Sequence, residues 1–166
     1  ITYDTTIVRS TDFNAAIPAK LGNAVATDKP SNDLSDSGYR AWSNIAELEG
    51  PQGIKGFRST NNGRGSGTEQ LHDPKWQAPA NSRLSFKFYC TEPQTVVLTA
   101  ADHNAVELEV TASDNWQEMT IAPGRLINRF SRKPMSDWSS VGKIHFLPKQ
   151  GSDLTKVIFA DFKWVQ

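Results

Sequence analysis

Two of the five tryptophans stand in segments typical of loops, where an aromatic ring can meet a ligand. Trp42 lies in "GYRAWSN" with Tyr39 and Arg40, and Trp76 lies in "HDPKWQAP" after His72. A sugar ring needs such a setting, because its C–H face stacks on an aromatic ring while planar polar side chains bind its hydroxyls. We therefore predict that these five residues contact a carbohydrate. Packing of both tryptophans in the protein interior is the alternative.

A local basic patch is the second candidate for ligand binding. The segment "GRLINRFSRKP" carries Arg125, Arg129, Arg132 and Lys133 in an otherwise neutral chain. Because the donor fork of arginine matches carboxylate and sulfate groups, Arg125 and Arg129 are predicted to bind an acidic or sulfated polymer. Arg64, in the glycine-rich "STNNGRGSG", is predicted to join them from a flexible loop. A solvated loop without a ligand is the alternative for the patch.

The C-terminal segment "VIFADFKWVQ" places one acidic residue, Asp161, among large apolar residues. Strict alternation along a strand puts Phe159 and Asp161 on one face and Phe162 and Trp164 on the other. An aspartate in such surroundings needs a backbone donor, a basic side chain or a hard cation as partner. Calcium is the sharper hypothesis, and its predicted ligands are Asp161, Asp4 and Asp12. A hydrogen-bonded or edge-exposed aspartate is the alternative.

Other site chemistries are disfavoured by spacing. The glycines of "NNGRGSG" match neither dinucleotide nor P-loop spacing, and a nucleophile elbow around Ser66 would need glycine in place of Arg64. The three histidines are too far apart in the sequence for a zinc site, and the single cysteine, Cys90, excludes a disulfide framework. We therefore predict no catalytic residues and no enzyme activity in this chain.

Alternating segments dominate the second half of the chain. Leu84, Phe86 and Phe88 alternate with polar residues, and so do Val106 and Leu108. Further strands are predicted in the first half at 44–49 and 54–58, and in the second half at 95–100, 116–123, 142–148 and the C-terminus. Strands separated by short turns and no long helical pattern predict an all-β chain, folded as a two-sheet antiparallel sandwich with few or no helices.

Length and composition set the class of protein. A chain of 166 residues fits one domain, 1–166, with a sizeable core, and its formal charge of zero argues against a nucleic-acid partner. It has no apolar run of the roughly 18 residues that a membrane span needs. The start "ITYDTTIVRS" has no initiator methionine. We therefore expect a piece excised from a larger polypeptide, without a membrane partner.

The later motifs resemble a known family. "DNWQEMTIAPGRL" and "MSDWSSVGKIHFLPKQGSDLTKVIFADFKWV" are similar to the jelly-roll, galactose-binding-like carbohydrate-binding modules of secreted bacterial polysaccharide-degrading enzymes. The resemblance implies a jelly-roll sandwich, often with a structural calcium, that binds a glycan without cleaving it. It also implies that Trp116, Trp138 and Trp164 belong to the scaffold. Whether the glycan would lie on a sheet face or among the end loops stays open.

The expected function is therefore noncatalytic. A monomeric module would bind a polysaccharide or oligosaccharide and target a glycoside hydrolase or lyase in the same polypeptide, outside a bacterial cell or on its surface. Two alternatives remain. One is a small jelly-roll polysaccharide lyase using Arg, His and Tyr; the other is an ancillary structural domain that binds no sugar.

Overall fold

The structure is a computed structural model that describes residues 33–34 and 39–166. The described strands lie in one compact unit, whose described residues are 33–34, 39–73 and 77–166. We call this unit the sandwich. Residues 74–76 belong to a separate unit.

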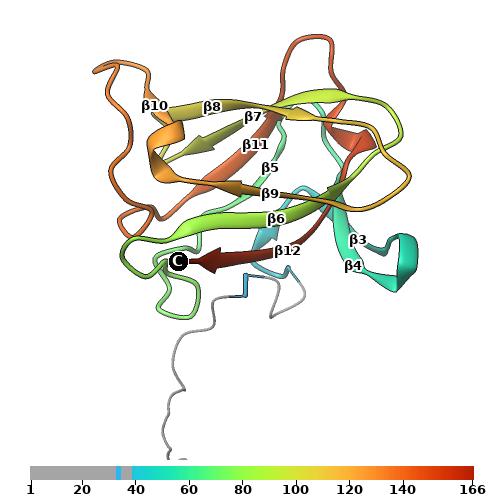
Figure 1. Ribbon diagram of the computed structural model, residues 1–166, viewed down its shortest axis with the longest axis horizontal. Coiled ribbons are helices and arrows are strands. Elements are labelled where there is room, and N and C mark those ends of the chain that lie inside the picture. The colour runs from blue at the N-terminus through green and yellow to red at the C-terminus, as the bar shows by residue number, and fades with distance from the viewer. Residues whose placement is uncertain (1–32, 35–38) are drawn as a thin grey trace, which may run out of the picture. The chain divides into compact units, whose positions relative to one another are not determined.

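Two antiparallel sheets form the sandwich (Figure 1). The six-stranded sheet has the order β10 (Ile127–Asn128), β8 (Asn104–Val110), β7 (Gln94–Ala100), β11 (Ile144–Pro148), β5 (Ser66–Thr68) and β2 (Trp42–Ser43). The five-stranded sheet has the order β3 (Ile45–Glu49), β4 (Lys55–Ser59), β12 (Ile158–Val165), β6 (Arg83–Tyr89) and β9 (Gln117–Ile121). The predicted all-β, two-sheet architecture is confirmed.

Helical structure in the described residues is limited to three short 3₁₀ turns, η1 (Pro51–Gly53), η2 (Pro123–Arg125) and η3 (Leu154–Lys156). None of the described helices has the length and apolar character that crossing a membrane requires.

Aromatic side chains fill the space between the sheets. Phe162 stacks on Phe57 with ring centroids 5.7 Å apart and on Phe86 at 5.0 Å. Phe146, from the six-stranded sheet, lies 4.8 Å from Phe159 and thereby joins the two layers. All five rings are essentially inaccessible to solvent. Because buried aromatic rings each remove a large apolar area from water, this cluster is the centre of the core.

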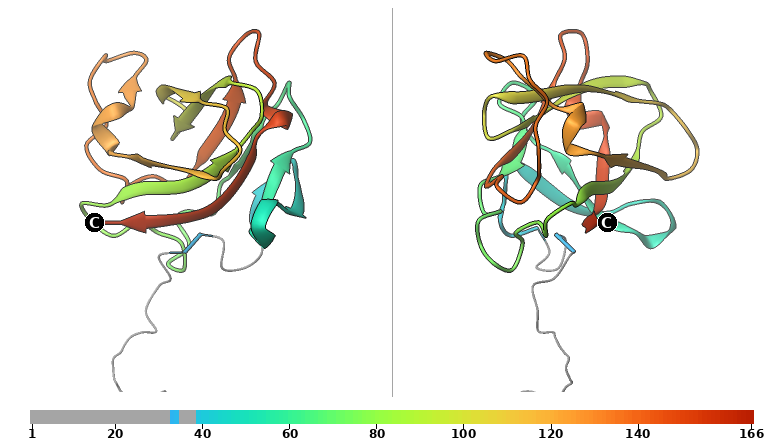
Figure 2. Two further views of the ribbon diagram at one scale, coloured as in Figure 1. Left: turned by 45° about the vertical axis from the view of Figure 1, so that its right-hand side comes forward. Right: turned by 60° about the vertical axis from the view of Figure 1, so that its left-hand side comes forward.

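A β-bulge at Asp161 brings two of those rings into the core from one strand. The pairing of β12 with β6 shifts register between Ala160 and Lys163, and Asp161 adopts a left-handed backbone with φ 58°. An extra residue at this point reverses the alternation, so Phe159 before the bulge and Phe162 after it both point inward. The predicted placement of these two residues on opposite faces is wrong for this reason. In Figure 2, β12 is seen to run beside β6 along its length.

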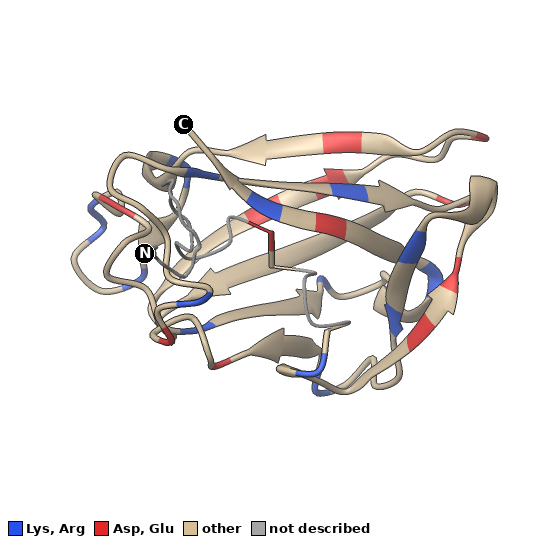
Figure 3. Ribbon diagram, turned by 90° about the horizontal axis from the view of Figure 1, so that it is seen from below, with Lys and Arg blue, Asp and Glu red and all other residues tan. Residues whose placement is uncertain are grey.

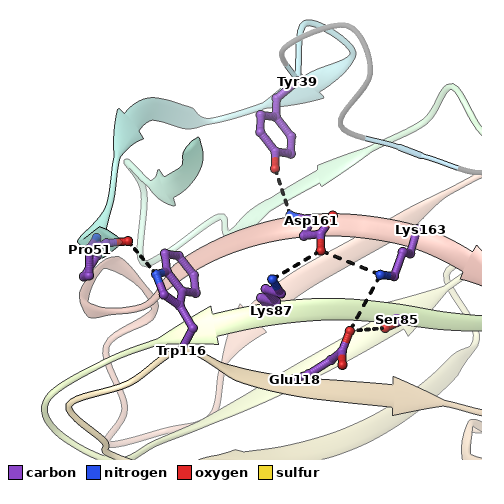
Figure 4. A network of polar contacts seen from close by, with 8 residues as sticks. All are labelled: Tyr39, Pro51, Ser85, Lys87, Trp116, Glu118, Asp161 and Lys163. Carbon is purple, nitrogen blue, oxygen red and sulfur yellow. Dashed lines mark hydrogen bonds and ion pairs between the residues drawn. The ribbon is translucent and has the colours of Figure 1, made fainter. Parts of the chain in front are cut away.

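The outer side of the bulge carries a ladder of polar contacts (Figure 4). The Asp161 carboxylate lies 3.7 Å from the ammonium groups of both Lys87 and Lys163, and Lys163 lies 3.8 Å from Glu118. The Asp161 backbone N–H donates to the Tyr39 hydroxyl at 3.2 Å. Asp161 and Lys163 are the acidic and the basic position of β12, the strand that ends near the C-terminus in Figure 3. Exposed pairs of this kind each contribute about 1 kcal/mol or less.

The glycine-rich segment 59–67, predicted to be a flexible loop, has a turn at 62–64 between the end of β4 and the start of the strand β5. β5 covers Ser66–Thr68, and its residues are buried between β11 and β2. A Cβ at Gly65 would clash with the Phe146 carbonyl, and one at Gly67 would clash with the Ile144 carbonyl. The glycines therefore permit close approach to β11.

The three tryptophans assigned to the scaffold are found there. Trp138 is fully buried, donates from Nε1 to the Ile121 carbonyl at 3.1 Å and lies 5.5 Å from the buried ring of Trp164. Trp116 is half-buried and donates to the Pro51 carbonyl at 2.8 Å. The stick view in Figure 4 shows this last bond, which joins the residue before β9 to the first residue of η1.

Replacing Phe162 with alanine tests the central role of the aromatic cluster. The change deletes a ring that touches both sheets, so we expect a loss of about 3–5 kcal/mol in the free energy of unfolding. Urea denaturation followed by tryptophan fluorescence measures it. Phe130→Ala is the matched control, because that ring is 77% exposed and its removal should change stability by no more than about 0.5 kcal/mol. Equal losses in the two variants would contradict the assignment.

The left-handed residue of the bulge predicts a second contrast. Asp161→Asn keeps a side chain that tolerates this backbone, whereas Asp161→Val places a β-branched residue there. Both substitutions remove the same charge. We expect thermal unfolding to show Asp161→Val less stable than Asp161→Asn by about 1–2 kcal/mol. Equal stability of the two variants would mean that the bulge does not constrain residue choice.

Candidate functional site

One row of residues crosses the outward face of the whole six-stranded sheet. Strand pairing aligns each residue of this row with the next, and paired residues in a sheet share a face. The row reads Ser43, Gly67, His145, Thr99, Ala105 and Ile127. Most of these side chains are small, because the large side chains of the same strands point into the core. Because the outward side chains in the middle of the sheet are small, the surface there is recessed, and we call this recessed surface the floor.

A hollow of about 260 Å³ lies on this floor. Thr99, His145 and Leu147 line it from β7 and β11, and Glu69, Asp102, Lys143 and Arg129 line it from the ends of neighbouring strands. Its size approaches that of the smaller ligand sites of proteins. We take this hollow as the candidate functional site.

The charged residues of the rim alternate in sign. In the order of the strands that carry them they are Glu69, Lys143, Asp102 and Arg129, so that acids and bases balance. The Lys143 ammonium lies 2.8 Å from the Asp102 carboxylate and 4.0 Å from that of Glu69. Hydrogen bonding to Lys143 lowers the pKa of Asp102, and the same bond raises the pKa of Lys143. The rim therefore offers donors and acceptors side by side and has no net charge.

His145 is held in one orientation over the floor. Its Nε2 lies 2.6 Å from the Arg64 carbonyl. Because a carbonyl only accepts, Nε2 carries a proton. The ring lies beside Gly67, where an added Cβ would come within 2.8 Å of Nδ1. The glycine thus leaves room for the imidazole, whose position is set by the backbone of β5 and of the loop before it.

The turn between β7 and β8 presents Asp102 to the hollow in a strained conformation. Ala101 and Asp102 both have a left-handed backbone, with φ 53° and 66°. Aspartate tolerates this region, but alanine does so at a cost of about 1–2 kcal/mol. The His103 N–H donates to the Ala101 carbonyl at 2.8 Å and closes the turn. The Lys143 contact then fixes the carboxylate that the turn projects.

The structure places two of the predicted aromatic ligands in the core. Trp42 is 8% exposed, and its ring lies 4.9 Å from Phe57 and 4.8 Å from Phe162. Tyr39 is 4% exposed and packs on the other edge of Phe57 at 4.9 Å. Packing, the alternative for Trp42, is therefore what the structure shows, because strand pairing turns β2 inward. Neither ring has an accessible face for a sugar.

The other residues of that prediction differ in exposure and in surroundings. Trp76 is half-buried with the Lys75 ammonium 5.3 Å from its ring centroid, and it belongs to the separate unit. Arg40 is exposed. His72 lies against Gly142, where a Cβ would clash with the imidazole ring, and Gly142 precedes Lys143 on the rim. His72 is thus the member of this group found beside the hollow.

The three predicted arginines differ in their relation to the hollow. Arg129 lines it, and Arg64 is exposed and supplies the carbonyl that holds His145. Arg125 is exposed at the end of η2. Their binding roles remain predictions.

The calcium site also remains a prediction. Asp4 and Asp12 lie outside the described residues. Asp161 has two lysine ammonium groups beside its carboxylate, which fits the basic-partner alternative better than a cation site. Within residues 33–34 and 39–166 no group of three His, Cys, Asp or Glu side chains is placed to hold a metal ion.

Sequence reasoning missed most of the residues that line the hollow. His145 alternates with the apolar Ile144 and Phe146 in its strand, but nothing in its neighbourhood in the sequence marks a binding site. The useful signal is the coincidence of small residues, Gly67, Thr99 and Ala105, at paired positions. That coincidence exists only once the strands are aligned.

Comparison with known proteins finds solved structures with a similar fold. The sequence matches no protein-family model and no curated protein. The structure is similar to the family 11 carbohydrate-binding module of the cellulosomal cellulase Lic26A-Cel5E of Clostridium thermocellum, with a TM-score of 0.55, 14% identity, and coverage of 84% of this chain and 95% of the other. It is also similar to the family 11 module from Clostridium thermocellum in complex with a β-1,3-1,4-mixed-linked tetrasaccharide, with a TM-score of 0.54, 13% identity, and coverage of 84% and 97%.

The chain shares the fold of these modules. The resemblance inferred from the tryptophan motifs is thereby confirmed for the architecture. At 13–14% identity the likeness says nothing of which residues bind a ligand, so the hollow rests on the geometry of this chain alone.

Removing Lys143 tests the electrostatics of the rim. Lys143→Met should raise the pKa of Asp102 toward its ordinary value of about 3.9, because the hydrogen-bonded ammonium is lost. Lys149→Met is the control, since Lys149 pairs with Glu107 instead, and it should leave Asp102 unchanged. Carboxyl-carbon NMR titration reads both variants.

The same pair gives a pH dependence with a defined sign. Because the pKa of Asp102 is lowered in the fold, Asp102 stabilises the fold above its pKa in the unfolded chain, and this stabilisation is lost as the pH falls. Because the pKa of Lys143 is raised in the fold, Lys143 stabilises the fold below its pKa in the unfolded chain, and this stabilisation is lost as the pH rises. The pair therefore supports the fold between about pH 4 and about pH 10. A pKa of Asp102 unaffected by Lys143→Met would refute the coupling.

Proposed function

We propose that the sandwich is a noncatalytic carbohydrate-binding module that holds a glycan in the hollow of the six-stranded sheet. The observation that carries the proposal is the hollow itself: a floor of small side chains with a rim of alternating donors and acceptors. Sugar hydroxyls both donate and accept hydrogen bonds, so they can pair with the donors and with the acceptors of the rim. The shared fold with two carbohydrate-binding modules, one of them in complex with a tetrasaccharide, supports it.

The charge balance of the rim bears on which glycan enters the hollow. Glu69 and Asp102 offset Lys143 and Arg129, so the hollow has no excess of positive charge to attract a polyanion. Hydrogen bonding to hydroxyl groups is then the main polar interaction available. We infer that the sugar units in the hollow are uncharged.

Catalysis is not the function that this arrangement favours. Both rim carboxylates lie within 4.0 Å of the Lys143 ammonium group, and hydrogen bonding to Lys143 lowers the pKa of Asp102. A general acid needs the opposite, a carboxyl whose pKa is raised. A lyase using histidine and tyrosine is not supported either, since the described residues that line the hollow include His145 but no tyrosine.

In this proposal the module serves a catalytic domain elsewhere in a longer, secreted bacterial polypeptide. One of the similar modules is part of a cellulosomal cellulase, which supports such an arrangement by analogy of fold. A shallow site gives weak binding, but tethering raises the local concentration of the enzyme at its polymer. A monomeric module is sufficient for that role.

Filling the hollow is the direct test. Thr99→Trp puts a large ring on the floor, and we expect affinity electrophoresis in β-1,3-1,4-mixed-linked glucan to show at least about tenfold weaker binding. Thr95→Trp is the matched control, because Thr95 lies on the same face of β7 at about 13 Å along the strand and does not line the hollow. It should bind as the wild type does.

Two results would overturn the proposal. The first is a wild-type protein that is not retarded by this glucan or by any member of a panel of neutral, uronate and sulfated polysaccharides, which would favour an ancillary domain. The second is the appearance of new reducing or unsaturated ends during incubation, which would show an enzyme. His145→Ala provides a second variant: it should weaken binding, and it should lower stability only by about 1 kcal/mol, for the lost bond to the Arg64 carbonyl.

A further inference from the structure

The turn after β10 carries the most exposed large apolar side chain of the described residues. Phe130 is 77% exposed, and the other exposed large apolar residue, Ile127, starts the same segment at 37%. We call the segment Ile127–Pro134 the Phe130 turn. It stands out from one edge of the six-stranded sheet (Figures 1 and 2). A single exposed ring is ordinary, so its meaning depends on what surrounds it.

The Phe130 turn is held in place by its own backbone and by one side chain. Asn128 Oδ1 accepts hydrogen bonds from the N–H groups of Phe130 at 2.9 Å and Ser131 at 3.0 Å. The Asn128 backbone exchanges two further bonds of 2.9 Å, with Arg132 and Lys133. A fixed turn presents the ring with little conformational entropy left to lose on binding. This is the arrangement expected of a contact surface.

The Phe130 turn is continuous with the hollow. The Arg129 N–H donates to the His103 carbonyl at 2.8 Å, and the His103 and Phe130 rings meet edge to face with centroids 5.1 Å apart. Asp102 and Arg129, the neighbours of these two residues in the sequence, line the hollow. A polymer that leaves the hollow at this end therefore reaches Phe130 next.

The charge of the Phe130 turn differs from that of the rim. Arg129, Arg132 and Lys133 lie within it and Arg125 just before it, all four are exposed, and the sequence has no acidic residue from Pro123 to Ser136. None of the four forms an ion pair with an acidic side chain of the described residues, whereas Lys143, Lys149 and Lys156 each do. Even with Arg129 counted toward the neutral rim, Arg125, Arg132 and Lys133 give the turn and its start an excess of positive charge.

We propose that the Phe130 turn is a second subsite, which binds a sugar unit bearing an anionic group, a carboxylate or a sulfate. The Phe130 ring stacks on the C–H face of that unit, while Arg132 and Lys133 bind the anion. This inference rests on the proposed function, because it extends a glycan from the hollow. The polymer recognised is then one in which uncharged and anionic sugar units occur together.

Matched polymers test the subsite. Affinity electrophoresis compares β-1,3-1,4-mixed-linked glucan with its carboxymethylated and sulfated derivatives, which share one backbone and differ in the anion. Because the protein has no net charge, general attraction to a polyanion is not expected. We expect wild-type protein to bind at least one charged derivative about tenfold more tightly than the neutral parent. That gain should shrink as salt is raised, and the better derivative identifies the anion.

Variants locate the effect. The double variant Arg132→Asn/Lys133→Gln should lose the tighter binding to charged derivatives and still bind the neutral glucan. Asparagine is chosen because it tolerates the left-handed backbone of residue 132, where Arg132 has φ 64°. Lys55→Gln with Arg58→Gln is the control, because it removes the same charge from exposed positions of β4 in the other sheet and should keep the gain. Phe130→Ala should weaken binding to all three polymers, with thermal unfolding unchanged.

The possible failures are distinct. Equal binding of neutral and charged polymers by the wild type, or a gain that survives Arg132→Asn/Lys133→Gln, would overturn the second subsite and leave the proposed function standing. No binding to any of the three polymers would overturn both. The last experiment measures binding to vesicles of phosphatidylcholine and phosphatidylserine. If the protein binds these vesicles through Phe130 and does not bind charged glucans more tightly than the neutral one, the turn binds a membrane surface and the second subsite is overturned.

Discussion

The packing of Phe159 and Phe162 side by side in the core is the constraint on which the rest of the structure depends. A regular strand would send one of these rings to the core and the other to the opposite face. The bulge at Asp161 removes that conflict by adding one residue to β12. The strand can then present Phe159 to Phe146 of the opposite sheet and Phe162 to Phe57 and Phe86 of its own. The aspartate fits because its side chain tolerates the left-handed backbone and points to two lysines.

A core filled from the five-stranded sheet also shapes the outside of the six-stranded sheet. Phe146, Ile144 and Leu98 turn inward to meet the aromatic cluster, which leaves the intervening residues of the same strands outward. Those outward residues are small or polar, and the hollow forms where Gly67 and Thr99 flank His145. The hollow is thus a consequence of the alternation that builds the core. Its rim comes from strand ends, where the chain is free to carry charge.

The division of charge between the hollow and the Phe130 turn links shape to selectivity. Lys143 and Arg129 are balanced by Asp102 and Glu69, so the hollow has fixed hydrogen-bonding groups without net charge. The turn beside it has basic residues without acidic neighbours in the sequence. Two adjoining surfaces of different charge can discriminate between polymers of one backbone by their substituents. Neither surface depends on the aromatic residues that first suggested sugar binding, Trp42 and Tyr39, which serve the core instead.

Alternation and turn residues act locally, so the amino-acid sequence was sufficient to predict the class of the fold and the strands β3, β4, β6, β7, β8, β9, β11 and β12. The scaffold role of Trp138 and Trp164 could also be predicted, through their motifs. Strand pairing controls the features that could not be predicted. The bulge at Asp161, the strand hidden in the glycine-rich segment and the row that joins Gly67, His145 and Thr99 all depend on register between distant segments. Register follows from long-range packing, which no local pattern of residues encodes.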